Sequence, residues 1–183
     1  MIWYILISIG ALLLVVWIIY FNSFVRFTNK VHGAESDVDV QLKRRFDLLP
    51  NLVEIVKGYA KHERELFENI ATQRSQFDGA VNTQEKAKAG NEITSLLKNL
   101  FVVVENYPEL LADKSFINLQ NSLIEIEDQI QMSRRYYNAV VRDYNTLVES
   151  FPGLVFAKVS GYKAVPFFEI AFLEKTVIQV KLS

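Results

Sequence analysis

The feature that most constrains the fold is an uncharged run of 20 residues, Ile2 to Phe21. As an α-helix rising about 1.5 Å per residue, it would be roughly 30 Å long, which matches the hydrocarbon thickness of a bilayer. Aromatic residues stand near both ends, as in the aromatic belts of membrane helices: Trp3, Tyr4, Trp17, Tyr20 and Phe21. We therefore predict a transmembrane anchor over residues 1–21.

A cleaved signal peptide is the alternative interpretation of this run. No basic segment precedes it, no small-x-small site follows it, and it exceeds the apolar core of about 7–15 residues that signal peptides carry. We therefore expect a retained helix. Arg26 and Lys30 follow the run, so the positive-inside rule predicts an N-terminus outside and a cytoplasmic C-terminal domain.

Composition limits the remaining possibilities. The 183 residues carry a net charge of −1 and are 50% apolar, which fits one domain plus an anchor and disfavours a nucleic-acid binder. The absence of cysteine excludes a disulfide framework, a thiolate zinc site and a lipidated cysteine. Only 7 glycines and 4 prolines are present, which favours long helices.

Apolar residues after the anchor recur every three or four positions, the spacing of amphipathic helices. This pattern predicts an all-α fold, in which the transmembrane helix continues into an antiparallel four-helix bundle of coiled-coil-like helices over residues 22–151. The expected packing residues are Leu52, Val56, Tyr59, Leu66 and Ile70 in the second helix, Leu97, Leu100 and Val104 in the third, and Leu119, Leu123, Ile126, Ile130, Tyr137, Val140 and Tyr144 in the fourth.

The first corner of this bundle is predicted at Asp47 to Pro50. Asp47 would cap the second helix, and Pro50 is tolerated in a first helical turn because its missing N–H has no partner there. Three cations, Lys43, Arg44 and Arg45, would then end the first helix, where they complement the helix dipole. We interpret these five residues as candidates for the turn and for contact with a partner.

An aromatic-rich tail is predicted over residues 152–183. Because a four-helix order returns the fourth helix toward the membrane, the tail either packs across the base of the bundle or lies at the lipid interface or against another subunit. The interfacial candidates are Phe151, Phe156, Tyr162, Phe167 and Phe168. The last eight residues, TVIQVKLS, alternate as a short strand does, although a lone strand needs a partner to be stable.

Catalytic and metal-binding motifs are incomplete. His62-Glu63 begins like a zinc-protease motif, but Leu66 stands where the second histidine is required. The other histidine, His32, has no glutamate three residues before it, as a di-iron carboxylate site would need. Ser133 lies within the apolar stripe without a histidine placed to activate it. We therefore predict no enzyme activity, cofactor or metal.

Several segments resemble the signature of the bacterial LemA family, chiefly RRFDLLPNLVE and YNTLVESFP behind the apolar run. The resemblance implies a single-pass protein of the bacterial inner membrane with a helical domain and no established enzymatic activity. Some members are similar to proteins implicated in remodelling bacterial organelle membranes, and others are linked to a membrane protease of the HtpX type.

The function expected from these features is a non-enzymatic, membrane-anchored scaffold that forms homo-oligomers. Its partners would be the lipid bilayer and further copies of the chain, without nucleic acid or a small-molecule substrate. The alternative is an adaptor or regulator of a membrane protease or of a cell-envelope stress response.

Overall fold

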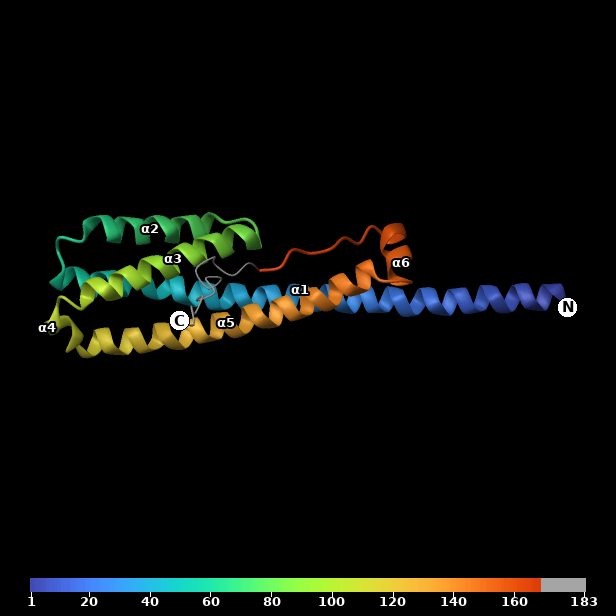
Figure 1. The fold of residues 1–183 in the computed structure, drawn as a ribbon, viewed down its shortest axis with the longest axis horizontal. Coiled ribbons are helices and arrows are strands. Elements are labelled where there is room, and N and C mark those ends of the chain that lie inside the picture. The colour runs from blue at the N-terminus through green and yellow to red at the C-terminus, as the bar shows by residue number, and fades with distance from the viewer. Residues whose placement is uncertain (169–183) are drawn as a thin grey trace, which may run out of the picture. The chain divides into compact units, whose positions relative to one another are not determined.

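A computed structural model of the chain describes residues 1–168, and within them it is all α-helical (Figure 1). The elements are α1 (Ile2–Tyr59), α2 (Arg64–Gly79), α3 (Thr83–Val104), α4 (Pro108–Leu111), α5 (Lys114–Glu149) and α6 (Gly153–Ser160). The predicted all-α class is confirmed. The strand signal in TVIQVKLS falls outside the described residues.

The chain divides into two compact units, and α1 and α5 each contribute to both. Unit 1 comprises Met1–Asp37 and Ser133–Phe167, whereas unit 2 contains Val38–Met132 and, among the described residues, Phe168. The boundary therefore crosses two long helices instead of lying in a loop.

The predicted corner at Asp47 to Pro50 is wrong, because α1 continues through Pro50 to Tyr59. A proline inside a helix removes one hydrogen bond and costs about 3 kcal/mol. On both sides of it, however, α1 presents one continuous buried face that includes Phe46, Leu49 and Leu52. Burying each such side chain contributes about 1.5–3 kcal/mol, which outweighs the penalty of the proline.

The actual corner lies between Tyr59 and Arg64, more than two helical turns later. This later corner changes which residues form the packing face, because the chain turns at a point where the apolar pattern was predicted to continue along a single second helix. Tyr59 is exposed, Leu66 is only half-buried, and Phe67 takes the buried position. The stripe assigned to a single second helix is thus divided between α1 and α2.

The described part of unit 2 contains residues 38–59 of α1, the helices α2 and α3, the short α4, and residues 114–132 of α5. Aromatic rings mark two contacts between these segments, with Phe46 against Phe77 at 4.2 Å and Phe101 against Phe116 at 6.5 Å between centroids. The predicted packing residues that are buried here are Leu52, Val56, Ile70, Leu97, Leu100, Val104, Leu123, Ile126 and Ile130, while Leu119 is half-buried.

Local signals in the sequence set the starts of two helices. The Asn82 side chain accepts a hydrogen bond from the Glu85 amide, and the Glu85 carboxylate accepts one from the Val81 amide, as at a capped helix start. Asp113 likewise accepts from the Ser115 and Phe116 amides at the start of α5. These bonds satisfy backbone donors that have no partner within the helix.

Unit 1 is built from residues 2–37 of α1, residues 133–149 of α5, the short helix α6 and the extended segment 161–167. Tyr137, Val140 and Tyr144 of the fourth predicted helix are buried in this unit. In Figure 1, α6 lies across α1, and α1 continues past α6 with no other element beside it.

Candidate functional site

Arg45 occupies the centre of unit 2 and is almost completely buried, with 1% of its side chain exposed. Its guanidinium donates to the Glu127 carboxylate at 2.7 Å, to the Thr94 hydroxyl at 2.9 Å and to the Gly90 carbonyl at 2.7 Å. One side chain of α1 thereby binds both α3 and α5. We call Arg45, Gly90, Thr94 and Glu127 the arginine clamp.

The electrostatics of the clamp follow from its burial. Desolvation lowers the pKa of Arg45, and the neighbouring Glu127 carboxylate partly offsets this effect. Removing a charge from water is costly unless partners replace the lost hydration, and here three acceptors do so. The clamp therefore holds three helices in one register.

The burial of Arg45 contradicts its prediction as a partner-contact residue. Lys43, Arg44, Asp47 and Pro50 are exposed, so Arg45 alone of this group points inward. A signal was available in the sequence, because Arg45 is three residues after Leu42 and four before Leu49, on the apolar face of α1. It was missed because the helix was predicted to end at this point.

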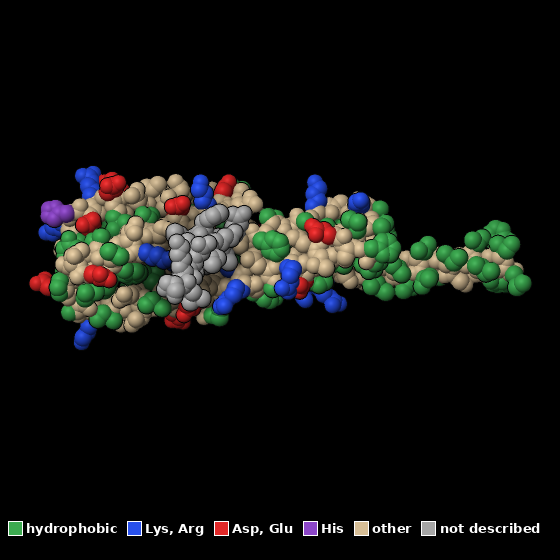
Figure 2. Space-filling model, in the orientation of Figure 1, with side chains coloured by type: hydrophobic (Ala, Val, Ile, Leu, Met, Phe, Trp, Pro, Cys, Tyr) green, Lys and Arg blue, Asp and Glu red, His purple; other side chains and the backbone are tan. Residues whose placement is uncertain are grey.

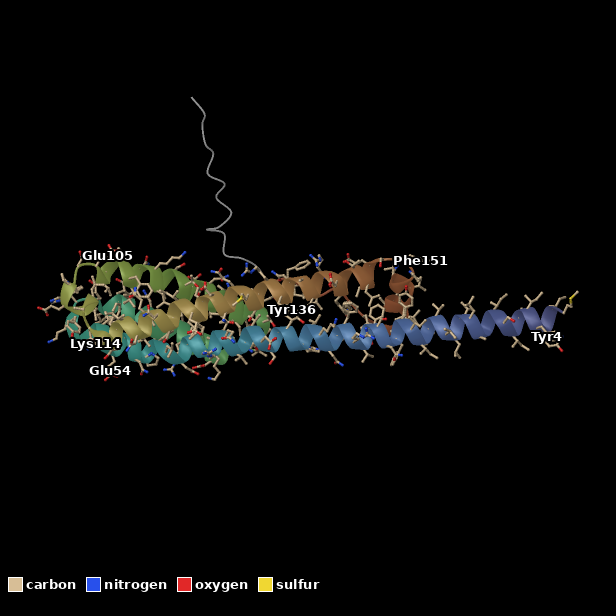
Figure 3. All side chains as sticks on the ribbon, turned by 90° about the horizontal axis from the view of Figure 1, so that it is seen from below. Tyr4, Glu54, Glu105, Lys114, Tyr136 and Phe151 are labelled. Atoms are coloured by element: carbon tan, nitrogen blue, oxygen red, sulfur yellow. The ribbon has the colours of Figure 1, made fainter. Side chains whose placement is uncertain are left out.

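The uncharged N-terminal segment is exposed throughout its most apolar window. That window has a mean hydropathy of 2.7, and none of it is buried against the rest of the described chain. Figure 2 shows hydrophobic side chains along this segment, and Figure 3 shows the side chains near Tyr4 pointing away from α1 on all sides. A core helix would be covered by protein, so this segment has the exposure and length expected of a membrane-spanning helix.

An aromatic cluster forms where the uncharged segment ends. The Phe156 ring of α6 lies 4.5 Å from Trp17 and 5.1 Å from Phe24, and the Phe24 ring lies 4.5 Å from Tyr162 and 6.4 Å from Tyr144. Burial raises the pKa of Tyr144. The cluster fastens α6 to the helix pair of unit 1.

The extended segment after α6 runs back along α5. Asn145 donates its side-chain amide to the Val165 carbonyl at 2.8 Å and accepts from the Val165 amide, also at 2.8 Å. The Tyr137 hydroxyl donates to the Pro166 carbonyl at 3.2 Å. Side chains of α5 thus provide the hydrogen bonds that a neighbouring strand would otherwise supply.

The interfacial candidates have separate environments. Phe156 belongs to the buried cluster, Tyr162 is half-buried beside it, and Phe168 is buried. Phe151 and Phe167 are exposed. Helix α6 itself was not predicted, although Pro152 before it and Gly161 after it are typical helix boundaries.

A shallow hollow of about 420 Å³ lies at the corner between α1 and α2 in unit 2. Its lining residues include Lys57, Lys61 and Arg64, but Lys57 lies over the Phe67 ring at 5.5 Å and Arg64 is paired with Glu68 at 2.7 Å. Within residues 1–168, no group of three His, Asp or Glu side chains is arranged to hold a metal ion. Neither feature brings together the residues of a catalytic site.

Comparison with known proteins identifies the family. A model of the LemA family matches residues 34–182, which is most of the chain. The chain belongs to the LemA family. The LemA match includes the arginine clamp, α6 and the extended segment, whereas the apolar segment and the Trp17 and Phe24 side of the aromatic cluster precede it.

The curated relatives have low sequence identity to this chain. The magnetosome protein MamQ 2 of Paramagnetospirillum magneticum is 24% identical over 81% of this chain, and the magnetosome protein MamQ of Magnetospirillum gryphiswaldense is 23% identical over 81%. The protein LemA of Metamycoplasma hominis is 26% identical over 71% of this chain. This LemA-family chain matches only 64% of the length of the two MamQ proteins and 60% of the M. hominis protein.

Proposed function

We propose that this LemA-family chain is a non-enzymatic scaffold of the bacterial inner membrane, which self-associates and organises the membrane around it. The observation that carries the proposal is the unbroken course of α1 from Ile2 to Tyr59. Its first part is an exposed apolar segment of spanning length, and its last part supplies the buried face and the clamp arginine of unit 2. Anchor and helical core are therefore parts of one helix, with no linker between them.

The similarity to curated relatives supports a role at a membrane. Two of the relatives are named as magnetosome proteins. The family resemblance adds that some members are similar to proteins implicated in remodelling bacterial organelle membranes. Arg26 and Lys30 follow the apolar segment, which supports an N-terminus outside and a cytoplasmic helical domain. The bilayer is accordingly the first partner that we propose.

The surface of unit 2 supports self-association. Ile124 of α5 is 55% exposed, and Ile117, one heptad earlier, is also exposed. A spacing of seven places both side chains on one face of the helix, as in a coiled-coil seam. The coiled-coil-like packing of an antiparallel four-helix domain would thereby extend to a second copy of the chain.

The mass of the full-length protein in detergent and in native-lipid particles tests this proposal, measured by light scattering with electron microscopy. We expect a uniform assembly that forms without other proteins. Ile124→Glu places a charge on the proposed seam and should reduce the mass toward that of one chain. Ser122→Glu adds the same charge at an exposed position of α5 that lies two residues from Ile124 and thus on another side of the helix, so it should leave the assembly intact.

A monomer in both preparations would contradict the scaffold proposal. It would favour the alternative role as an adaptor or regulator of a membrane protease, for which crosslinking in cells would identify the partner. If Ile124→Glu and Ser122→Glu behave alike, the proposed α5 seam is wrong even if the protein is oligomeric.

A further inference from the structure

Helix α6 is fastened at the end of the apolar segment by close packing. A Cβ at Gly153 would lie 2.1 Å from the Leu147 carbonyl oxygen, so only glycine lets α6 begin this close to α5. Gly161 ends the helix with a φ of 78°, a conformation that favours glycine. Between them, the Phe156 ring stacks on Phe24 and contacts Trp17 at a tilted angle, so the position of α6 along α1 is set by ring contacts.

The inner and outer faces of α6 are both apolar, which is unusual for a surface helix of a protein surrounded by water. Gly153, Phe156 and Ala157 are buried on the inner face. On the other side, Val155 is 56% exposed and Val159 69%, and Phe151 just before the helix is 84% exposed. An outer face of this composition requires an apolar environment.

The charged side chains of α6 and of the segment that follows it are lysines, and the nearest acidic residue before them is Glu149 at the end of α5. Lys158 lies on the helix and Lys163 just after it, both exposed, and residues 150–168 include no Asp or Glu. Short basic and aromatic helices with an apolar face are typical of elements that lie in the headgroup region of anionic membranes. The charge pattern therefore favours lipid over a second protein as the occupant of this face.

The position of α6 along the length of α1 also agrees with a location at the membrane interface. Trp17, which contacts Phe156, lies four residues before the end of the uncharged segment at Phe21. Aromatic residues at that level of a spanning helix lie at the interface between acyl chains and headgroups. Because α6 lies across α1 in Figure 1, its axis would run along the membrane surface.

We propose that α6 is a second membrane-contact element, which inserts Phe151, Val155 and Val159 into the acyl boundary and places Lys158 and Lys163 at anionic lipid phosphates. This inference rests on the proposed membrane anchoring of α1. The anchor alone attaches the protein to the membrane at one place. Helix α6 adds a second contact, which sets the tilt of the α1–α5 pair of unit 1 relative to the membrane.

The test measures the depth of single probes in the full-length protein, which has no native cysteine. Val155→Cys and Val159→Cys are labelled with an environment-sensitive fluorophore, and the protein is placed in vesicles of phosphatidylethanolamine and phosphatidylglycerol. Nitroxide lipids that carry the quencher at different depths then locate each probe. We expect both probes about 5–10 Å below the headgroups, with blue-shifted emission.

Two further labels distinguish failure of this inference from failure of the proposed anchor. Leu13→Cys, within the apolar segment, should be quenched most strongly by deep nitroxides. Glu105→Cys, in the exposed turn after α3, should not be quenched. If Leu13→Cys is quenched and the α6 probes remain in water, the α6 inference is wrong and the anchor stands. If Leu13→Cys is also unquenched, the proposed membrane anchoring of α1 is wrong.

A second copy of the chain is the competing occupant of the outer face. In that case the α6 probes would show blue-shifted emission without quenching by any nitroxide lipid, which would overturn the inference. The lysines give a separate test with vesicles in which phosphatidylcholine replaces phosphatidylglycerol. We expect shallower α6 probes there, because zwitterionic phosphatidylcholine removes the net negative charge of the headgroup region; an unchanged depth would exclude the proposed preference of the lysines for anionic lipids.

Discussion

The two units of this LemA-family chain share two helices, but the contacts inside each unit are chemically different. In unit 2, the arginine clamp binds α1 to α3 and α5 through a buried charge. In unit 1, aromatic rings and the two Asn145 hydrogen bonds fasten α6 and the segment after it. A buried charge with three partners has one favourable geometry, whereas stacked rings tolerate small displacements.

This difference fits the proposed surroundings of each unit. Charged networks are stable in a domain surrounded by water, where they specify how neighbouring helices align. Aromatic rings are favoured at the membrane interface, where one side of the ring system is apolar and the other is hydrated. The comparison predicts that substitutions in the clamp change folding of unit 2, while those in the ring cluster change the attachment of α6.

The largest effect is expected from Arg45→Ala, which leaves the Gly90 carbonyl and the Glu127 carboxylate without their donor. Breaking a buried pair in this way costs about 3–5 kcal/mol, and partial exposure of Glu127 places the expected loss near the lower end. Urea unfolding of the full-length protein in detergent, followed by circular dichroism, measures this loss. Exposed Arg44→Ala should change stability by less than about 0.5 kcal/mol. Equal effects would show that the clamp does not stabilise unit 2.

An effect of similar size, but confined to unit 1, is expected from Phe24→Ala. Phe24 is fully buried and contacts Tyr144, Phe156 and Tyr162, so its truncation removes the centre of the cluster. We expect a loss of about 3 kcal/mol in local stability, measured as faster amide hydrogen exchange in α6. Exchange in α3 should stay unchanged. Faster exchange in both helices would contradict the separation into two units.

Asn145→Ala should release the extended segment at a cost of about 1–2 kcal/mol, because two hydrogen bonds to the Val165 backbone are lost. Amide exchange at Val165 and tryptic cleavage after Lys163 report this release. Thr146→Ala is the control, since the Thr146 hydroxyl donates to the Arg142 carbonyl of its own helix. Unchanged protection at Val165 would show that other contacts hold the segment.

The smallest effect concerns pH and the start of α5. Hydrogen bonds from the Phe116 and Ser115 amides lower the pKa of Asp113 below its ordinary value of 3.8. A carboxyl whose pKa is lower in the folded state stabilises the fold above its unfolded pKa and loses this contribution as pH falls through the folded value. We therefore expect an acid-side loss of stability beginning below about pH 5.

Asp113→Ser keeps a capping oxygen but removes the titrating group. Thermal unfolding of both proteins between neutral and acid pH should show a shallower acid-side slope for Asp113→Ser. Identical slopes would mean that Asp113 is not a source of the pH dependence.

Much of the fold follows from apolar periodicity. The spacing of Leu123, Ile126 and Ile130 predicts α5, and the 20-residue uncharged run predicts an exposed apolar helix. These features are local, because the period of three and four residues reflects the geometry of a single helix. The course of α1 through Pro50 was not predicted, since the cost of a proline is local while the burial that outweighs it comes from other helices.

The features of the candidate site likewise divide into those that the sequence predicts and those that depend on tertiary contacts. Sequence alone determined the all-α class, the apolar segment, the LemA resemblance and the lack of a complete catalytic motif. Only the tertiary structure decided that Arg45 is buried and that Phe156 lies against Trp17, because partners 45 to 139 residues apart in the sequence make those contacts. Periodicity shows which side of a helix is apolar, but the identity of the opposing surface depends on where the chain turns.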